Sequence, residues 1–360
     1  MKKNALILIV SLICLLGSCS SNDEVKSSEN YIEEFKIAGI TAEIKNNINQ
    51  IYILVFEEDY EDILNAEPSQ IKCSKNATLS NSSGKWTENG FTYTVTAENG
   101  DTRNYTVYIG IVHKKYSFES WVLSDSTEGY YIPSDSNSSW SSGNEGIKMA
   151  LQILPGRDHK NRKSYPTKDT VDIYGNAVLL ETLEGGDVFG RKIPLLSGNL
   201  IFGNFNASKA ITDELSATEL GRNYPAKPKS IKGFYKYKEG PGTFMNNGAE
   251  VPGRRDTCTI KAEFYRSDSD TDRSDITLNV RTIEGSDLII ATANLKSCVE
   301  TAGDEFYPFE VEFGAYREEP DFRNHRYKLA ITFAASRDGG TYAGKIGSKL
   351  IIDEVEFVDY

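Results

Sequence analysis

Residues 91–110 read FTYTVTAENGDTRNYTVYIG, and this stretch decides the fold class. Phe91, Tyr93 and Val95 alternate with threonine, so every second side chain points to one face, as in a half-buried β-strand. Asn99-Gly100 supplies the positive φ angles of a tight turn, and the alternation resumes after it. The pattern predicts a β-hairpin, and it indicates an all-β protein.

The hairpin closes a run of short strands and turns that begins at Tyr31. Residues 51–56 are apolar on both faces, which is typical of a strand in the middle of a sandwich. This spacing favours an immunoglobulin-like β-sandwich over residues 31–112. We expect it to act as a spacer, with sugar binding by Trp86 and Tyr93 as the alternative.

A larger unit follows the linker His113-Lys114-Lys115, and we assign it to residues 116–360. Its alternating runs predict nine strands in two packed sheets, and a jelly roll is the architecture we expect. One helix is predicted over Ser208–Leu220, with Ile211 and Leu215 facing inward. The expected strands are residues 147–154, 177–183, 231–237, 258–265, 276–283, 288–295, 309–313, 327–334 and 350–357.

Composition is typical of an exported β-protein. The 360 residues include 40 Lys plus Arg and 52 Asp plus Glu, and the resulting formal charge of −12 argues against nucleic acid as a partner. A supply of 20 Tyr, 16 Phe and 3 Trp suits sheet faces and flat binding surfaces. Three His are too few for a His-rich metal site, and Gly-x-Ser-x-Gly does not occur, which disfavours Ser-His-Asp catalysis.

The first nineteen residues predict export. Lys2 and Lys3 precede an apolar run, residues 5–16, that has the length of a signal-peptide core. The run ends in Leu16-Gly17-Ser18-Cys19, which resembles a bacterial lipobox, and this resemblance implies a lipid on Cys19. Residues 20–30 would form a polar tether similar to the surface-export signals of Bacteroidetes lipoproteins. We therefore expect a lipid-anchored protein of the outer membrane, displayed at the cell surface, that contacts the membrane through its anchor only.

Three cysteines remain beyond the predicted signal, namely Cys73, Cys258 and Cys298. An odd number cannot pair completely. Cys258 and Cys298 could bridge two strands if their Cα atoms come within about 7 Å. We favour buried free thiols over this disulfide.

A carboxylate in the last predicted strand suggests a metal site. Alternation over residues 349–357 puts Asp353 on the apolar face of Ile351 and Val355, where a lone charge is costly. Glu119 lies in the first strand, and the first and last strands of jelly rolls commonly lie close together. Glu119 and Asp353, with backbone carbonyls, could hold a structural Ca²⁺. Alternatively, and with equal weight, Asp353 accepts hydrogen bonds from loop amides or an Arg and binds no metal. We expect the protein to require no other cofactor.

A loop rich in small polar residues surrounds Trp140, whose ring either packs onto the sheet or offers a face to a ligand. Sugar rings stack on aromatic faces, while amides and carboxylates bond their hydroxyl groups. The predicted carbohydrate site combines aromatic platforms with polar partners, and its residues are Trp121, Tyr131, Trp140, Asn144, Glu145 and Asp338.

Four separated segments resemble, in order, the putative carbohydrate metabolism domain of Bacteroidetes lipoproteins. The family stretches read like W-A-T-G-N-x-G, L-K-G-Y-Y-K-Y and S-S-x-x-G-x-x-x-x-G-x-G-S-x-L-x-V-D-E, and Ser141-Ser142 here replaces the family's Ala-Thr. The resemblance covers residues 117–360 and implies an Ig-like sandwich, a jelly roll and a pocket for sugar. The matching segments are Phe118-Glu-x-Trp121, Trp140-Ser-Ser-Gly-Asn-Glu-Gly146, Ile231-Lys-Gly-Phe-Tyr-Lys-Tyr237 and residues 336–354.

We therefore expect an outer-membrane-tethered glycan-binding protein whose partner is an oligo- or polysaccharide. One alternative is a glycoside hydrolase with two carboxylates across a cleft. The other is a non-catalytic adhesion or assembly component, which a large exposed apolar patch would favour. The sequence leaves the glycan and the oligomeric state open. The carboxylates eligible for hydrolysis are Glu119, Glu145, Glu181 and Asp338.

Overall fold

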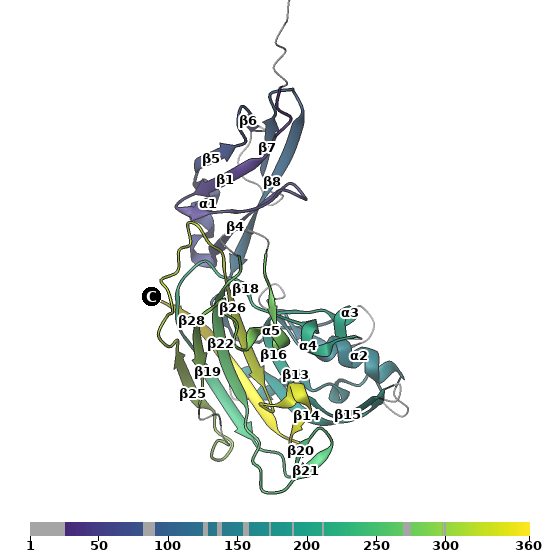
Figure 1. Ribbon diagram of the computed structural model, residues 1–360. Coiled ribbons are helices and arrows are strands. Elements are labelled where there is room, and N and C mark those ends of the chain that lie inside the picture. The colour runs from purple at the N-terminus through teal and green to yellow at the C-terminus, as the bar shows by residue number, and fades with distance from the viewer. Residues whose placement is uncertain are drawn as a thin grey trace, which may run out of the picture.

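The protein is all-β, as predicted, and consists of a small N-terminal domain above a larger one (Figure 1). The predicted signal peptide, Cys19 and Trp86 lie outside the residues that the structure describes. Within the described part, no helix combines the length and the apolar character needed to cross a membrane. The computed structural model describes residues 26–81, 91–124, 129–134, 139–153, 158–172, 174–188, 191–210, 212–268, 275–296, 298 and 300–360.

Two sheets enclose the core of the N-terminal domain. A three-stranded sheet has the order β2 (Ile40–Thr41), β1 (Ile32–Ile37), β5 (Pro68–Cys73). A five-stranded sheet has the order β3 (Glu43–Lys45), β4 (Gln50–Phe56), β8 (Thr102–Val112), β7 (Phe91–Thr96), β6 (Thr78–Asn81). A short helix, α1 (Tyr60–Asn65), follows β4.

The hairpin predicted from residues 91–110 is confirmed as the antiparallel pair β7 and β8. Its apolar residues Phe91, Tyr93 and Val95 are buried in the N-terminal core, as their alternation requires. The central position expected for residues 51–56 is also confirmed, because β4 lies between β3 and β8. Sugar binding by Tyr93 was the wrong alternative, since its ring is in the core.

The two domains are packed directly against each other. The ring centroids of Phe56 and Tyr224 lie 5.5 Å apart across the boundary. Arg326 donates to the Glu43 carboxylate at 2.9 Å, and Asn223 donates to the same carboxylate at 3.2 Å. The core of the larger domain extends to Val112 at the end of β8. These contacts join the N-terminal domain to one end of the larger one (Figure 1).

Two large sheets pack face to face in the C-terminal domain. The seven-stranded sheet has the order β13 (Thr167–Asp172), β14 (Gly175–Val188), β28 (Lys349–Asp359), β19 (Pro228–Lys238), β25 (Tyr307–Glu312). Two further strands flank it, β15 (Arg191–Ser197) beside β14 and β9 (Lys115–Tyr116) beside β28. The β9–β28 pair makes the first and last strands of the domain neighbours, but the predicted first strand was wrong, because Glu119 lies in the segment that follows β9 and belongs to no strand.

The opposing eight-stranded sheet has the order β23 (Leu278–Asn279), β17 (Thr218–Leu220), β16 (Asn199–Phe205), β26 (Tyr327–Ala334), β22 (Thr259–Arg266), β24 (Ile289–Asn294). Its other members are β12 (Trp140–Ser141), paired with β16, and β18 (Arg222–Asn223), paired with β26. Two small ribbons complete the domain: β10 (Trp121–Leu123) with β11 (Tyr131–Pro133), and β21 (Ala249–Val251) with β20 (Phe244–Asn246) and β27 (Ala343–Gly344).

Two expected strands and the expected helix were wrong, and the two large sheets contain fifteen strands among the described residues where nine were expected. Residues 147–154 fall largely in α2 (Asn144–Ile153), and residues 276–283 form only β23 before the short helix α5 (Val280–Ile283). Ile147 and Leu151 are four residues apart, so their spacing fits a helix face as well as alternation. The expected helix 208–220 is instead two short helices, α3 (Ala207–Ala210) and α4 (Glu214–Ala217), followed by β17.

Cys258 and Cys298 form a disulfide, with their Cα atoms 5.4 Å apart. Our preference for free thiols was therefore wrong. Cys258 directly precedes β22, and Cys298 follows β24, the antiparallel neighbour of β22, so the two ends meet. Sheet pairing brings the two cysteines together although 40 positions separate them in the chain.

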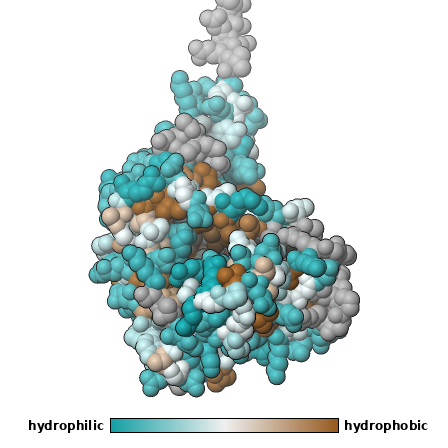
Figure 2. All heavy atoms as spheres, turned by 60° about the horizontal axis from the view of Figure 1, so that its bottom comes forward, coloured by the Kyte–Doolittle hydropathy of each residue, from teal (hydrophilic) through white to brown (hydrophobic). Residues whose placement is uncertain are grey.

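With the bottom of Figure 1 turned toward the viewer, the visible face is mainly hydrophilic and carries hydrophobic patches (Figure 2). Much of the apolar surface is instead enclosed between the sheets.

Candidate functional site

Trp140 is a core residue and was wrongly predicted as a sugar platform. It is 3% exposed, and its ring lies 5.2 Å from the rings of Tyr116 and Phe202. Because β12 pairs with β16, the Trp140 ring is held between the two large sheets. A sugar cannot stack on a ring that is surrounded by other side chains.

Asn144 also has a structural role in place of the predicted ligand contact. It is fully buried, and its Nδ2 donates to the Thr167 carbonyl at 2.6 Å. The Thr167 amide donates back to Asn144 Oδ1 at 3.3 Å. This reciprocal pair fixes the start of α2 against β13, while Glu145, the next residue, is exposed.

The three other predicted residues are dispersed over two regions. Trp121 and Tyr131 belong to the β10–β11 ribbon, where Tyr131 lies under the Arg162 guanidinium at 4.1 Å. Asp338 accepts from Arg254 at 2.6 Å in the loop before β27. The structure therefore does not support the predicted site as one assembly.

The glycine-rich loop 336–348 is held by Asp256, a residue that sequence reasoning missed. The buried Asp256 Oδ2 accepts from Ser336 Oγ at 2.6 Å, Ser348 Oγ at 2.8 Å and the Lys345 amide at 2.8 Å. Burial raises the pKa of Asp256 above its usual value. The two serines of the family-like motif thus secure the loop.

An aromatic cluster occupies the outward face of the seven-stranded sheet. Ile231, Tyr235 and Tyr237 of β19 face the core, so Phe234 and Lys236 face outward. The Phe234 ring lies 5.1 Å from that of Tyr174, which in turn lies 5.8 Å from that of Phe306. Tyr174 is 46% exposed, so this cluster is open to solvent.

Charged groups border these rings. Lys236 Nζ lies 2.9 Å from Asp172 Oδ2 and 5.2 Å from the centre of the Phe306 ring. Phe234 pairs in register with Asp353 on β28. We call this assembly the ring-and-carboxylate face, and its residues are Glu119, Asp172, Tyr174, Phe234, Lys236, Phe306 and Asp353.

Asp353 reaches the outward face through a β-bulge. Glu354 has φ 48°, and the register with β19 shifts between Lys232 and Phe234. The expected alternation therefore breaks: Val355 faces the core, whereas Asp353 does not share its face. Placing Asp353 on the core face was wrong, because one bulged residue reverses the side-chain order.

Asp353 is nevertheless fully buried, and its environment favours the protonated form. Burial raises the pKa of Asp353 to about 7, with further contributions from the negative charges of Glu354, Glu119 and Asp172. Its Oδ1 accepts from the Glu354 amide at 2.9 Å. Its Oδ2 has no hydrogen-bond partner among the described residues. A strongly perturbed carboxyl beside an aromatic cluster is a mark of a functional site.

Glu119 is exposed and anchored beside this group. Its Oε2 accepts from the Asn176 amide at 3.0 Å, and its carbonyl accepts from Asn176 Nδ2 at 2.9 Å. Gly175 has φ +115°, and a Cβ there would lie 2.3 Å from Glu119 Oε1. Only glycine leaves room for the carboxylate at this position.

The predicted calcium ligands are electrostatic neighbours, since the charge of Glu119 acts on Asp353. The described residues contain no group of three or more His, Cys, Asp or Glu side chains suited to a metal ion. A calcium ion bound by these two carboxylates would have to take its other ligands from carbonyl or water oxygens. Calcium binding therefore stays a prediction.

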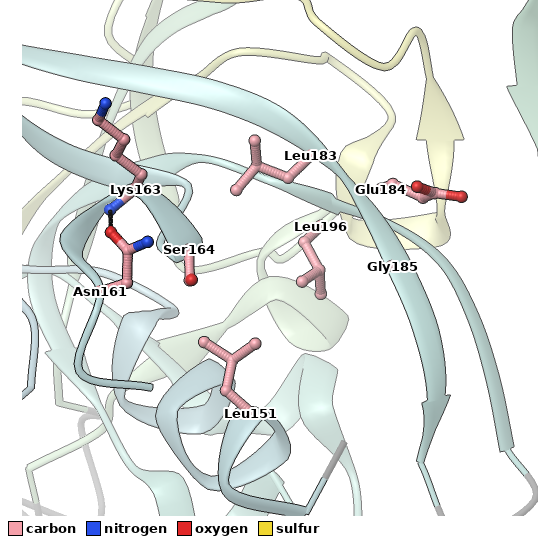
Figure 3. A pocket seen from close by; sticks show the side chains of 8 residues that line it. All are labelled: Leu151, Asn161, Lys163, Ser164, Leu183, Glu184, Gly185 and Leu196. Atoms are coloured by element: carbon pink, nitrogen blue, oxygen red, sulfur yellow. Dashed lines mark hydrogen bonds between the residues drawn. The ribbon is translucent and has the colours of Figure 1, made fainter. Parts of the chain in front are cut away.

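A separate cavity of about 370 Å³ lies between α2 and the β14–β15 hairpin. The side chains of Leu151, Leu183 and Leu196 point toward a common space (Figure 3). Polar groups of Asn161, Lys163 and Ser164 form another part of its lining (Figure 3). Among the described residues, no aromatic ring lines this cavity, and they provide no stacking surface of the kind expected of a sugar site.

The outward rings could have been suspected from the sequence. Alternation in Ile231–Tyr237 separates Phe234 from Tyr235 and Tyr237 onto opposite faces. The alternation does not show which face of the strand packs against the core. Tyr174 and Phe306 are distant from Phe234 in sequence, and only the folded structure brings the three rings together.

The chain was compared with known protein families, curated proteins and solved structures. Residues 117–358 match the family model described as "Putative carbohydrate metabolism domain". None of the curated proteins matches the chain.

Two solved structures are similar over nearly their whole length. A crystal structure described as a putative glycoside hydrolase from Bacteroides thetaiotaomicron is 29% identical, covering 94% of this chain and 99% of that one, with a TM-score of 0.61. Another, described as a putative glycoside hydrolase from Bacteroides vulgatus, is 28% identical, covering 69% and 98% of the two chains, with a TM-score of 0.59. The protein belongs to the putative carbohydrate metabolism domain family.

Proposed function

We propose that the protein is an outer-membrane-tethered glycan-binding protein that holds saccharide on the ring-and-carboxylate face. The observation that carries the proposal is the solvent-open cluster of Tyr174, Phe234 and Phe306 beside Asp172 and Lys236. Family membership and the similar Bacteroides structures support a role in carbohydrate binding or metabolism.

The chemistry of the face suits a sugar. Aromatic faces stack on the C–H surface of pyranose rings, and charged groups bond the hydroxyls at the ring edge. Asp172 accepts hydrogen bonds and Lys236 donates them. The face therefore offers apolar and polar contacts within one area.

Titration of the full mature chain against a glycan library tests this proposal. We expect Tyr174→Ala to weaken binding by about tenfold, because one stacking contact contributes roughly 1 kcal/mol or more. Tyr360→Ala is the matched control, since Tyr360 is 72% exposed and lies outside the face. Equal affinity of the Tyr174→Ala and Tyr360→Ala variants for every glycan that binds would refute the assignment, as would an absence of binding.

Glycoside hydrolysis is the second candidate, favoured by the perturbed carboxyl of Asp353. A general acid must be protonated at working pH, and the pKa of about 7 provides this, while exposed Glu119 could act as the ionised partner. Binding ranks first because Asp353 is fully buried. Release of reducing sugar that persists in Asp353→Asn would exclude Asp353 as the acid.

Tethering rests on the lipobox-like segment that ends at Cys19. We expect Cys19→Ala to abolish incorporation of labelled fatty acid and to move the protein out of the outer-membrane fraction. An unchanged distribution and unchanged labelling would contradict a lipid anchor on Cys19.

A further inference from the structure

A broad, open hollow of about 810 Å³ lies at one end of the N-terminal domain. It is built by the residues that lead into β1, the loop between β3 and β4, and the start of β8. Asparagine is the commonest residue in its lining, which suits the recognition of hydroxyl groups because each side-chain amide both donates and accepts. The lining residues are Asn30, Tyr31, Asn46, Asn47, Asn49, Thr102, Arg103 and Asn104.

Arg103 is held in a fixed position within this hollow. Its Nε donates to Asn30 Oδ1 at 3.0 Å, and its Nη1 donates to the Asn46 carbonyl at 3.1 Å and to Asn49 Oδ1 at 3.2 Å. Its guanidinium lies 4.3 Å from the centre of the Tyr31 ring. Four contacts from two separate segments thus orient the planar group before any ligand arrives.

Among the described residues, Arg103 has no carboxylate partner of the kind that several other arginines of the protein have. Arg254 is paired with Asp338, Arg281 with Asp213 and Arg326 with Glu43. Arg103 forms no ion pair within the described part of the chain. Its guanidinium also interacts with the Tyr105 hydroxyl, and none of the hydrogen bonds given above uses its Nη2. An oriented guanidinium with free donors is the usual receptor for a carboxylate.

We infer that this hollow is a second binding site, specific for an acidic saccharide that carries a uronate carboxylate. The Nη2 donors of Arg103 would bind the carboxylate, and the amide of Asn47, which is exposed and has no protein partner among the described residues, would bond the hydroxyls. Tyr31, half-exposed, offers an aromatic surface beside them. The site lies on the domain for which a spacer was the leading expectation, and it does not involve Tyr93.

The test is calorimetric titration of the full mature chain with oligogalacturonate and with a neutral galactose oligomer of the same length. We expect the acidic oligomer to bind and the neutral one to bind at least about tenfold more weakly, since one charge-assisted hydrogen bond contributes about that factor. Arg103→Gln should remove this preference. Asn47→Ala should weaken binding of the acidic oligomer without affecting folding, and Asn65→Ala, an exposed asparagine on α1, is the matched control.

Three outcomes would overturn the inference. These are equal affinity for the two oligomers, no binding of the acidic one, and a folded Arg103→Gln variant that binds as the wild type does. Wild-type binding by Arg103→Gln would show that Arg103 only stabilises the β3–β4 loop. If Arg103→Gln does not fold, Asn47→Ala decides, because wild-type affinity in that variant would also exclude the site. Tyr174→Ala separates the two proposals, since it should leave oligogalacturonate binding unchanged.

Discussion

Replacing Asp353 with asparagine should remove a pH dependence of stability that one buried carboxyl creates. In the folded protein the pKa of Asp353 is about 7, raised from 3.8 by burial and by the charges of Glu354, Glu119 and Asp172. Between these two pH values the folded chain retains a proton that the unfolded chain has released. The free energy of unfolding therefore falls as pH rises through this window.

The size of the effect follows from the difference in pKa. Each pH unit within the window costs about 1.36 kcal/mol, so a separation of about three units gives about 4 kcal/mol. The contribution is fully present below the unfolded value and lost above about pH 7. Asparagine keeps an oxygen that can accept from the Glu354 amide, and it cannot ionise.

Urea denaturation of the wild type and Asp353→Asn at pH 4.5, 6 and 8 measures this difference. We expect similar stabilities at the lowest pH and a variant more stable by up to about 4 kcal/mol at the highest. A difference that does not change with pH would refute the assigned burial of a protonated carboxyl. If added Ca²⁺ abolishes the slope in the wild type only, the carboxyl is ionised and serves as a metal ligand.

Three further substitutions test the packing. Trp140→Ala should lower the free energy of unfolding by about 3–5 kcal/mol, measured by urea denaturation, and should leave the glycan affinity of the folded protein unchanged, because Trp140 is a core residue. Replacing both Cys258 and Cys298 with serine removes the disulfide and should lower the free energy of unfolding by about 4 kcal/mol, as expected for a loop of this length. Unchanged stability would argue against the bond. Gly175→Ala should destabilise by more than about 1 kcal/mol, whereas Gly253→Ala, also at positive φ but with nothing near its Cβ, should cost clearly less; equal losses would contradict the close approach of Glu119.

Local patterns in the sequence were sufficient for the first hairpin and for seven strands of the larger domain, but strands such as β13, β15 and β16 were not predicted. The alternation around Phe91, Tyr93 and Val95 and the turn at Asn99-Gly100 specify the β7–β8 hairpin without any long-range information. Seven of the nine strands expected in the larger domain were found for the same reason. Where two periods fit equally well, as with Ile147 and Leu151, the local pattern could not separate helix from strand.

The candidate sites depended on contacts that no local pattern contains. The bulge at Glu354 reversed the face of Asp353, and sheet pairing brought Cys258 to Cys298. Asp256, far from the glycine-rich loop in sequence, holds that loop in place.

The sequence by itself determined an all-β chain, because strand periodicity and turn chemistry act over a few residues. Only the tertiary structure decided which aromatic rings are buried, which face solvent, and which charges have partners. Trp140 and Phe234 show the reason: burial depends on what another part of the chain places on top of a side chain.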